Sequence, residues 1–406
     1  MSKHSDYLSL TASSIPHSMA DYTAQDRIAD RLRLPFLHSE ITKLQGALAA
    51  LVTERSLIRR RLHAYTYPVL TLPTEIVSEI FIAYLPAYPN RPALFGDASP
   101  LKLTQICASW RQIAHGTPRL WQAIEMPFMT EHGSQFSPNC TAIAENWLSR
   151  SSALPLSVAF DVAYGKPQLS AVGTELWNVL ASHSSRWKYA QLDLRAIAPA
   201  YVAALRTMLP QLMEIDVRLP EGISGTSAVP GALSAPNLVT ALVRTRVENP
   251  PIIDFLPWVQ LTSLSLRDIA VSQVAPILRS APSLVRCRLK MFDGDALEMP
   301  VLPVSLPVLE TLIFDFWDQN EDPRDLFLAL RTPRLKNLAL FPFIDDPVGL
   351  KEYTMNRGFH LERLLVAGIG QEEKSAMLAA FPDISHLELS PDMCEANERA
   401  DEWQWW

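Results

Sequence analysis

A repeated spacing of apolar residues in the second half of this 406-residue chain restricts its fold more than any other feature. From about residue 185 onward the pattern is Leu-x-x-Leu-x-Leu, with other apolar residues at some places, and successive units begin 23 to 26 residues apart. The leading residues of the units are Tyr189, Leu212, Leu238, Leu261, Leu284, Leu309, Leu335, Leu361 and Ile384. A period of this length predicts a stack of similar units that bury one continuous core between neighbours.

Each unit has the pattern of a short strand that follows a helix. In six units a proline stands two positions before the leading residue: Pro210, Pro236, Pro282, Pro307, Pro333 and Pro382. Because proline cannot donate to a ladder, it belongs just outside the strand, where it also ends the preceding helix. Amphipathic segments precede several of the strands, at residues 202–209, 274–280, 326–331 and 372–381.

One strand and one helix per unit, at this period, resembles the leucine-rich repeat solenoid. The resemblance implies an α/β solenoid with a parallel sheet on its concave side over residues 123–391. Two degenerate units, Trp121-x-x-Ile124-x-Met126 and Leu156-x-Val158-x-Phe160, stand at its start. No asparagine recurs after the core pattern and the units vary in length, so the predicted solenoid is irregular.

A second motif begins at Leu72-Pro73-Thr74. Proline is preorganised for a first helical turn, and Glu75 and Glu79 favour the positive end of the helix dipole. The apolar side chains of this helix are Ile76, Ile80 and Phe81. About twenty-five residues later come the segment Ile106–Ala114, with Cys107 and Trp110, and the segment Thr117–Trp121. We expect Cys107 to lie inside the second helix as a core residue.

This combination over residues 70–122 resembles the F-box, a short helical module that docks on a Skp-type adaptor of cullin ubiquitin ligases. The resemblance implies that the adaptor-binding residues are Leu72, Pro73, Ile76, Ile80, Phe81 and Ile106. It also implies that Trp110 and Trp121 are core residues of the module. For Ile76, a core position is the alternative to adaptor binding. The loop over residues 85–100 is longer than in the compact form of the module. An ordinary helical hairpin is the alternative to the F-box.

Residues 1–25 are polar and without periodicity, which predicts disorder. Residues 26–65 are predicted to form an amphipathic helix. Because proline suits the first turn of a helix better than its interior, the residues around Pro35 are predicted to be a helix start. The helix carries a heptad seam at Ile41, Leu44, Leu48, Leu51, Ile58 and Leu62, interrupted by Arg55. Two roles are open for it, packing on the F-box or forming a homodimer through residues 39–63 as a short coiled coil.

Strand alternation predicts which residues line the concave face, namely those two, four and six places after each leading residue. Cations fill the sixth place of consecutive units and add to the same region: Arg195, Arg218, Arg244, Arg267, Arg286, Arg288 and Lys290. The later units are apolar there and include Phe341. We hypothesise a target with an acidic or phosphorylated portion over the first half and an apolar portion over the second. Alternatively, the cations have no binding role: their long side chains are solvated at the ends of the strands, and Asp193 and Asp216 neutralise part of the row.

The overall composition excludes several classes of protein. A formal net charge of −7 argues against a general nucleic-acid binder. Residues 1–18 lack the apolar core of a signal peptide, and no apolar run is long enough for a bilayer, so we expect a cytoplasmic or nuclear protein without a membrane partner. The cysteines Cys107, Cys140, Cys287 and Cys394 are far apart, as expected for buried thiols in a reducing compartment.

No constellation of catalytic residues, no phosphate-cradling glycine loop and no metal-ligand spacing occurs in the chain, so we expect no enzyme activity, cofactor or metal. The order of helix, F-box and leucine-rich repeats is similar to the expanded F-box families of mushroom-forming (basidiomycete) fungi. The resemblance implies a substrate-recruiting subunit of an SCF-type (Skp–cullin–F-box) ubiquitin ligase. Its partners would be the adaptor, a cullin reached through it, and an unknown protein target.

The alternative is a non-catalytic leucine-rich repeat scaffold whose F-box-like helices are structural or serve a non-ligase complex. The aromatic C-terminal tail, residues 392–406, contains Trp403, Trp405 and Trp406. Exposed aromatic residues of this density usually cover something, so the tail is predicted to cap the last repeat, with a flexible partner motif as the second reading.

Overall fold

The computed structural model describes residues 23–65, 68–126, 139–161, 171–195, 209–219, 233–245, 254–292, 302–316, 324–341, 347–357 and 360–392. The chain divides into two compact units, Met1–Leu72 and Pro73–Trp406. The predicted division between residues 122 and 123 falls inside the second of these units.

The first unit is built on one long helix, α1 (Ala24–Ala64), followed by a 3-10 turn, η2 (Pro68–Thr71). Thr23 caps the helix, because its hydroxyl accepts from the N–H of Asp26 and the Asp26 carboxylate accepts from the N–H of Thr23 at 2.9 Å. The helix runs through Pro35, where the sequence predicted only a helix start. Proline removes one backbone hydrogen bond, and the cap at Thr23 starts the helix upstream of it. Of residues 1–25, which were predicted to be disordered, residues 1–22 lie outside the described part of the chain, and Ala24 and Gln25 belong to α1.

The seam of α1 is exposed along its length. Leu44, Leu48 and Leu51 are 67, 62 and 63 % exposed, and Ile58 and Leu62 are also exposed. Both predicted roles of this helix, packing on the following helices and self-association, therefore stay predictions.

The second unit begins with four short helical elements: α2 (Thr74–Tyr84), α3 (Leu101–Ile106), α4 (Ala108–His115) and the 3-10 turn η3 (Pro118–Trp121). The helices predicted after Pro73 and before Ala114 are confirmed. Cys107 was predicted wrongly as a residue inside a helix. It stands between α3 and α4 and caps α4, since its Sγ accepts from the N–H of Trp110 at 3.4 Å.

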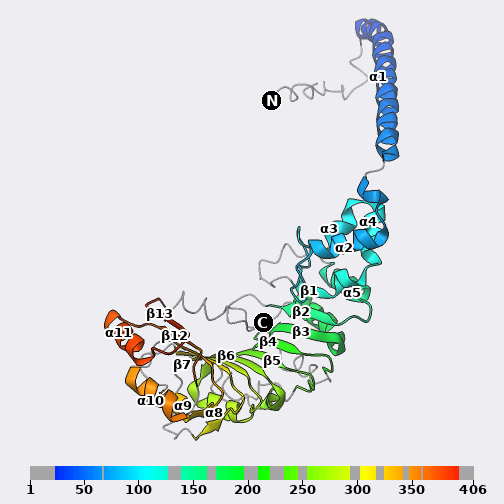
Figure 1. The fold of residues 1–406 in the computed structure, drawn as a ribbon. Helices are drawn as coiled ribbons and strands as arrows, with labels where there is room; N and C mark the ends of the chain where they lie inside the picture. Colours follow the sequence, from blue (N-terminus) through cyan, green and yellow to red (C-terminus); the bar gives the residue numbers. More distant parts are fainter. Residues whose placement is uncertain are drawn as a thin grey trace. The chain divides into compact units, whose positions relative to one another are not determined.

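The rest of the second unit is an α/β solenoid-like fold with an eleven-stranded sheet in the order β1-β2-β3-β4-β5-β6-β7-β9-β11-β12-β13 (Figure 1). All neighbouring strands in this sheet are parallel. The strands are β1 (Ala123–Met126), β2 (Leu156–Phe160), β3 (Trp187–Asp193), β4 (Glu214–Arg218), β5 (Thr240–Arg244), β6 (Ser263–Ala270), β7 (Arg286–Phe292), β9 (Thr311–Phe316), β11 (Asn337–Phe341), β12 (Arg363–Ala367) and β13 (His386–Ser390). The predicted parallel sheet with one strand per unit is confirmed, including the two early strands.

Further helices of the second unit lie between some of these strands in the described part of the sequence. They are α5 (Cys140–Arg150), α6 (Ala171–Ser182), α8 (Val271–Arg279), α9 (Arg324–Ala329), α10 (Pro347–Arg357) and α11 (Gln371–Ala380), with short 3-10 turns η4 (Ser184–Arg186) and η7 (Trp258–Gln260). Two further strands, β8 (Val304–Ser305) and β10 (Leu330–Arg331), pair with each other. The predicted helices at 274–280, 326–331 and 372–381 correspond to α8, α9 and α11, and the one at 202–209 lies almost entirely outside the described residues.

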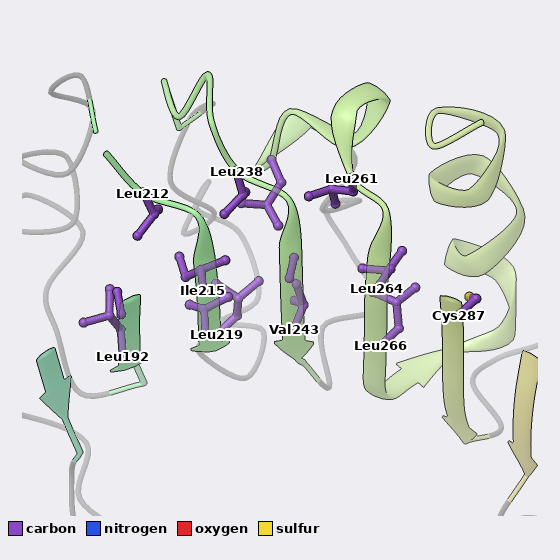
Figure 2. Close-up of a cluster of buried hydrophobic side chains, with 14 of the residues drawn as sticks. Leu192, Leu212, Ile215, Leu219, Leu238, Val243, Leu261, Leu264, Leu266 and Cys287 are labelled. Carbon is purple, nitrogen blue, oxygen red and sulfur yellow. The ribbon is translucent and has the colours of Figure 1, made fainter. Parts of the chain in front are cut away.

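A ladder of apolar side chains joins the strands on the helix side of the sheet. Figure 2 shows Leu212, Leu238 and Leu261 just before their strands, and Ile215 and Leu264 on theirs. All of them are at most 1 % exposed. Full burial of one such side chain contributes roughly 1.5–3 kcal/mol, so the repeated unit supplies its own stability layer by layer.

Aromatic residues join the helical elements to the sheet. Trp121 of η3 meets Trp147 of α5 edge to face, with ring centroids 5.2 Å apart. Trp177 of α6 in turn contacts Trp187 of β3 at 6.4 Å. These buried contacts explain why residues 73–122 and the sheet belong to one compact unit.

Candidate functional site

The helix α2 has apolar side chains on two faces, and only one face enters the core. Val77 and Phe81 are buried, 2 and 1 % exposed, and lie one turn apart. Ile76 and Ile80 also lie one turn apart, yet they are 50 and 45 % exposed. The exposed face, which we call the isoleucine face, is therefore not needed for the fold of the described residues.

Three further predicted adaptor-binding residues are also exposed. Ile106 at the end of α3 is 60 % exposed. Pro73 precedes the first turn of α2, and its carbonyl accepts from the N–H of Val77 at 3.1 Å. Leu72 is the exposed last residue of the first unit.

Phe81 was predicted as an adaptor contact, and the structure corrects this. Its ring packs edge to face on Trp110, with centroids 4.9 Å apart, in the core between α2 and α4. The reason is helical geometry, since one residue turns the side chain by about 100° away from Ile80. Trp110 and Trp121 lie in or against the core as predicted, and the Trp121 indole donates to the carbonyl of Ala114 at 2.8 Å.

Two polar contacts hold α2 against η3. The hydroxyls of Ser78 and Thr117 are 3.1 Å apart, and Arg119 donates to Glu79 at 2.9 Å. These contacts orient the isoleucine face relative to the rest of the helical segment.

The second candidate surface is the open face of the sheet, which carries the residues that alternate with the core ladder. At the strand exits the register aligns Asp193, Arg218, Arg244, Arg267, Lys290, Asp315 and Phe341. We call this row the exit row. It contains four cations between two carboxylates.

Arg195 was predicted as the first member of this row, and the register corrects that alignment by two residues. Tyr189 pairs with Glu214, so the first unit begins at the buried Trp187 and reaches the exit row at Asp193. The aromatic pair Trp187 and Tyr189 made both alignments compatible with the apolar pattern, and only strand pairing separates them.

Ion pairs bind the exit row together, as the alternative reading of the row predicted. Asp193 contacts Arg195 at 2.6 Å and Arg218 at 3.3 Å, and Asp216 contacts Arg244 at 3.1 Å. Burial opposes ionisation of Asp193, but the hydrogen bonds from Arg195 and the charge of Arg218 hold its pKa below the usual value.

Strands β6 and β7 carry the densest positive charge of this face. We call the four side chains Arg267, Arg286, Arg288 and Lys290 the basic patch. Arg288 is only 3 % exposed, and Lys290 is 4.0 Å from Asp315. Burial raises the pKa of Asp315, and the cations of the patch partly offset that effect.

An apolar cluster follows the basic patch along the sheet. Its members are Ile313, Ala339, Phe341, Leu365 and Ala367, and they form a cluster separate from the main core. We call it the apolar patch. Phe341 lies in it but is only 2 % exposed, so the structure does not present it as the exposed target contact that the sequence predicted. The two patches adjoin because Lys290, Asp315 and Phe341 are neighbours in register.

The loop between α2 and α3 also reaches the open face, which sequence reasoning missed. Arg91 donates to the Ser157 hydroxyl at 2.9 Å and to the Gln191 amide oxygen at 3.0 Å. Tyr88 packs edge to face on Tyr189, with centroids 5.4 Å apart. The proline-rich loop has no apolar periodicity from which this contact could be predicted. The only sequence feature that could have indicated it is the presence of Tyr88 and Arg91 near the centre of the loop.

Burial dominates the electrostatics where this loop meets the sheet. It lowers the pKa of Arg91 despite the nearby carboxylates of Glu214 and Asp216, and it raises the pKa of Tyr88 to about 12. The loop therefore places a half-buried cation at the β2–β3 end of the open face.

Within the described ranges, no three His, Cys, Asp or Glu side chains come together as metal ligands. Cys107, Cys140 and Cys287 are free thiols, and burial raises the pKa of Cys287. No helix in the described part of the chain has both the length and the apolar character needed to cross a bilayer.

Comparison with known proteins adds no further identification. No protein-family model matches this chain, and no curated protein is significantly similar to it. Functional inference therefore depends on the two surfaces themselves.

Proposed function

We propose that this chain is a target-recruiting subunit of an SCF-type ubiquitin ligase. Residues 70–122 would act as an F-box that docks on a Skp-type adaptor, and the sheet would act as a leucine-rich repeat receptor. The observation that carries the proposal is the isoleucine face, because two large apolar side chains stay about half exposed beside a complete core.

Exposed apolar side chains on a well-ordered helix are typical of a surface that a partner covers. Full burial of an exposed isoleucine is worth roughly 1.5–3 kcal/mol, so burying the exposed halves of Ile76 and Ile80 would together contribute about 1.5–3 kcal/mol of the roughly 8 kcal/mol of a micromolar complex. Ile106 and Pro73 would extend the contact at its edges. Such a helix-centred contact matches the role that the sequence resemblance implies.

The open face of the sheet would hold the target. Its basic patch suits carboxylate or phosphate groups, because arginine binds both with paired hydrogen bonds. Its apolar patch is at most 2 % exposed at each member and is not part of the proposed contact. The chain would then contribute proximity rather than chemistry, by holding a target lysine near a ubiquitin carrier supplied by its partners. We expect this to happen in the cytoplasm or nucleus.

The test is co-purification of the full chain with a Skp-type adaptor from the same organism. We expect wild-type protein to capture the adaptor and the Ile76→Glu/Ile80→Glu variant to lose at least about 30-fold in affinity, as for a central hot spot. A matched control is Val259→Glu, which changes a 66 % exposed apolar residue far along the sequence on η7.

Circular dichroism would verify that both variants stay folded. Absence of adaptor binding by folded wild type would overturn the proposal and favour the scaffold alternative. Equal capture by the double variant would overturn the assignment of the isoleucine face.

A further inference from the structure

The helix α1 exposes an apolar seam along one continuous stretch of helix. Leu44, Leu48 and Leu51 are 67, 62 and 63 % exposed. The seam continues in steps of three and four residues to the exposed Leu37, Ile41, Ile58 and Leu62. It lies between Pro35 and the end of the helix at Ala64. A seam with this spacing is buried by another helix that carries the same spacing, because the side chains of each helix fit between those of the other.

A second copy of α1 carries such a seam in either direction. The seam has a two-fold pattern about its centre, which lies between Leu48 and Leu51. When two copies lie antiparallel, the apolar residues of one meet apolar residues of the other. The resulting pairs are Leu48 with the partner's Leu51, Ile41 with the partner's Ile58, and Leu37 with the partner's Leu62.

Arg55 decides between the two directions. In a parallel pair each seam residue meets its own copy, so two Arg55 side chains would face each other within the contact. Their like charges would repel at a place that is shielded from water. In the antiparallel pair each Arg55 lies beside the partner's Leu44. Its aliphatic stem then packs on the leucine while its charged end reaches water. The single arginine of the seam therefore favours the antiparallel pair.

The charges at the border of the seam favour the same alignment. In the antiparallel pair each Glu40 faces the partner's Arg61, and the two-fold axis repeats this contact. A shift by one heptad would instead place Glu40 opposite the partner's Glu54 and Arg33 opposite the partner's Arg61. Glu40 contacts Lys43 of its own helix at 2.8 Å, but both side chains are exposed and such a pair adds little. Exchange of this partner for Arg61 therefore costs little.

We propose that residues 37–62 of α1 form an antiparallel two-stranded coiled coil with a second copy of this chain. The two chains then leave the coil at opposite ends, about 38 Å apart at a rise of 1.5 Å per residue. The dimer would hold two isoleucine faces and two sheets in one complex, so a target with two binding segments would bind with higher avidity. The avidity rests on the proposed function, whereas the coiled coil does not.

The first experiment is sedimentation equilibrium of full-length charge variants. Glu40→Arg should weaken self-association at least about fivefold, because both contacts with Arg61 become repulsive. Glu40→Arg/Arg61→Glu should restore it. The matched control is Glu54→Arg, which changes an equivalent border position that faces the partner's Ala47 in the antiparallel pair and should leave association unchanged. In a parallel pair Glu54 would face the partner's Arg59, so the two single variants would exchange their effects.

A second measurement maps the direction by disulfide formation. Equal amounts of Leu44→Cys and Arg55→Cys chains are mixed and oxidised, and the joined peptides are identified by mass spectrometry. We expect the main new product to join position 44 of one chain to position 55 of the other. Oxidised wild type gives the background from the natural cysteines.

Wild type that stays monomeric at tens of micromolar would rule out the second copy as the cover of the seam. Weakening by Glu54→Arg but not by Glu40→Arg, or new disulfides that join 44 to 44 and 55 to 55, would overturn the antiparallel direction. Circular dichroism would verify that each variant keeps its helix content. Failure of adaptor capture would leave these measurements unaffected, so the two proposals fail separately.

Discussion

Asp193 is the buried carboxylate at one end of the exit row. It accepts from Arg195 and pairs with Arg218 across to the next strand. It therefore ends the exit row with a negative charge where the sequence alignment had placed a cation. The row therefore has carboxylates at both ends of its four cations, which lie on β4, β5, β6 and β7.

We expect Asp193→Asn to lower the free energy of unfolding at pH 7 by about 2 kcal/mol, since it removes charged hydrogen bonds from a buried site. The folded-state pKa of Asp193 is depressed. Its contribution is therefore complete above the unfolded pKa of about 4 and is lost as the pH falls through the folded pKa. Urea unfolding of both proteins between pH 7 and pH 2 measures this difference. A gap that stays constant down to pH 2 would contradict the ionic explanation.

Phe81 and Ile80 are neighbours in sequence with opposite surroundings. Phe81→Ala should lower the free energy of unfolding by about 3–5 kcal/mol, because it opens a cavity against Trp110. Ile80→Ala should change it by no more than about 0.5 kcal/mol, since the side chain is half exposed. Chemical denaturation compares the two. Similar losses for both variants would show that the isoleucine face belongs to the core.

At the scale of the element, α1 is a long helix whose apolar seam is exposed. Its 41 residues include about four heptads, with Arg55 as the single charged member between Ile41 and Leu62. A seam of this length is at the lower limit for a coiled coil, and a buried arginine weakens it.

We expect the chain to self-associate through this seam at tens of micromolar, and Leu44→Glu/Leu51→Glu to make it monomeric. Ala50→Glu, on the same helix outside the seam, should leave the association unchanged. Sedimentation equilibrium of the three proteins provides the measurement. Monomeric wild type at these concentrations would favour packing of α1 elsewhere in the molecule.

At the scale of the whole molecule, the parallel sheet is a one-dimensional array in which each unit is stabilised by its neighbours. As a consequence, the loss in free energy of unfolding caused by a Leu→Ala substitution depends on the position of the leucine along the array. Leu264 lies in the middle of the array and is fully buried, whereas Leu387 lies on the last strand and is half-buried.

Leu264→Ala should therefore cost about 2–5 kcal/mol, and Leu387→Ala less than about 1.5 kcal/mol. Denaturant unfolding followed by circular dichroism measures both. Equal costs would contradict a layered array and indicate that the two ends pack as tightly as the middle.

Local patterns were sufficient to predict the repeating part of this protein. The Leu-x-x-Leu-x-Leu spacing, and the prolines that precede it, depend only on strand alternation and on the missing donor of proline. The strands, their parallel order and the buried ladder of Leu212, Leu238 and Leu261 were therefore readable from the chain. The helix at Thr74 was predictable for the same reason, from Pro73 and the acidic first turn.

Tertiary structure decided what no local pattern contains. Strand pairing shifted the first unit by two residues and replaced Arg195 by Asp193 in the exit row. The direction of the core decided that Phe81 is buried and Ile80 exposed, although both suit an apolar helix face. Arg91 reaches Ser157 and Gln191 across 66 and 100 residues of sequence. The physical reason is common to all three: apolar periodicity is a property of neighbouring residues, whereas register, the side that becomes core, and the partners of a buried charge depend on segments that meet only after folding.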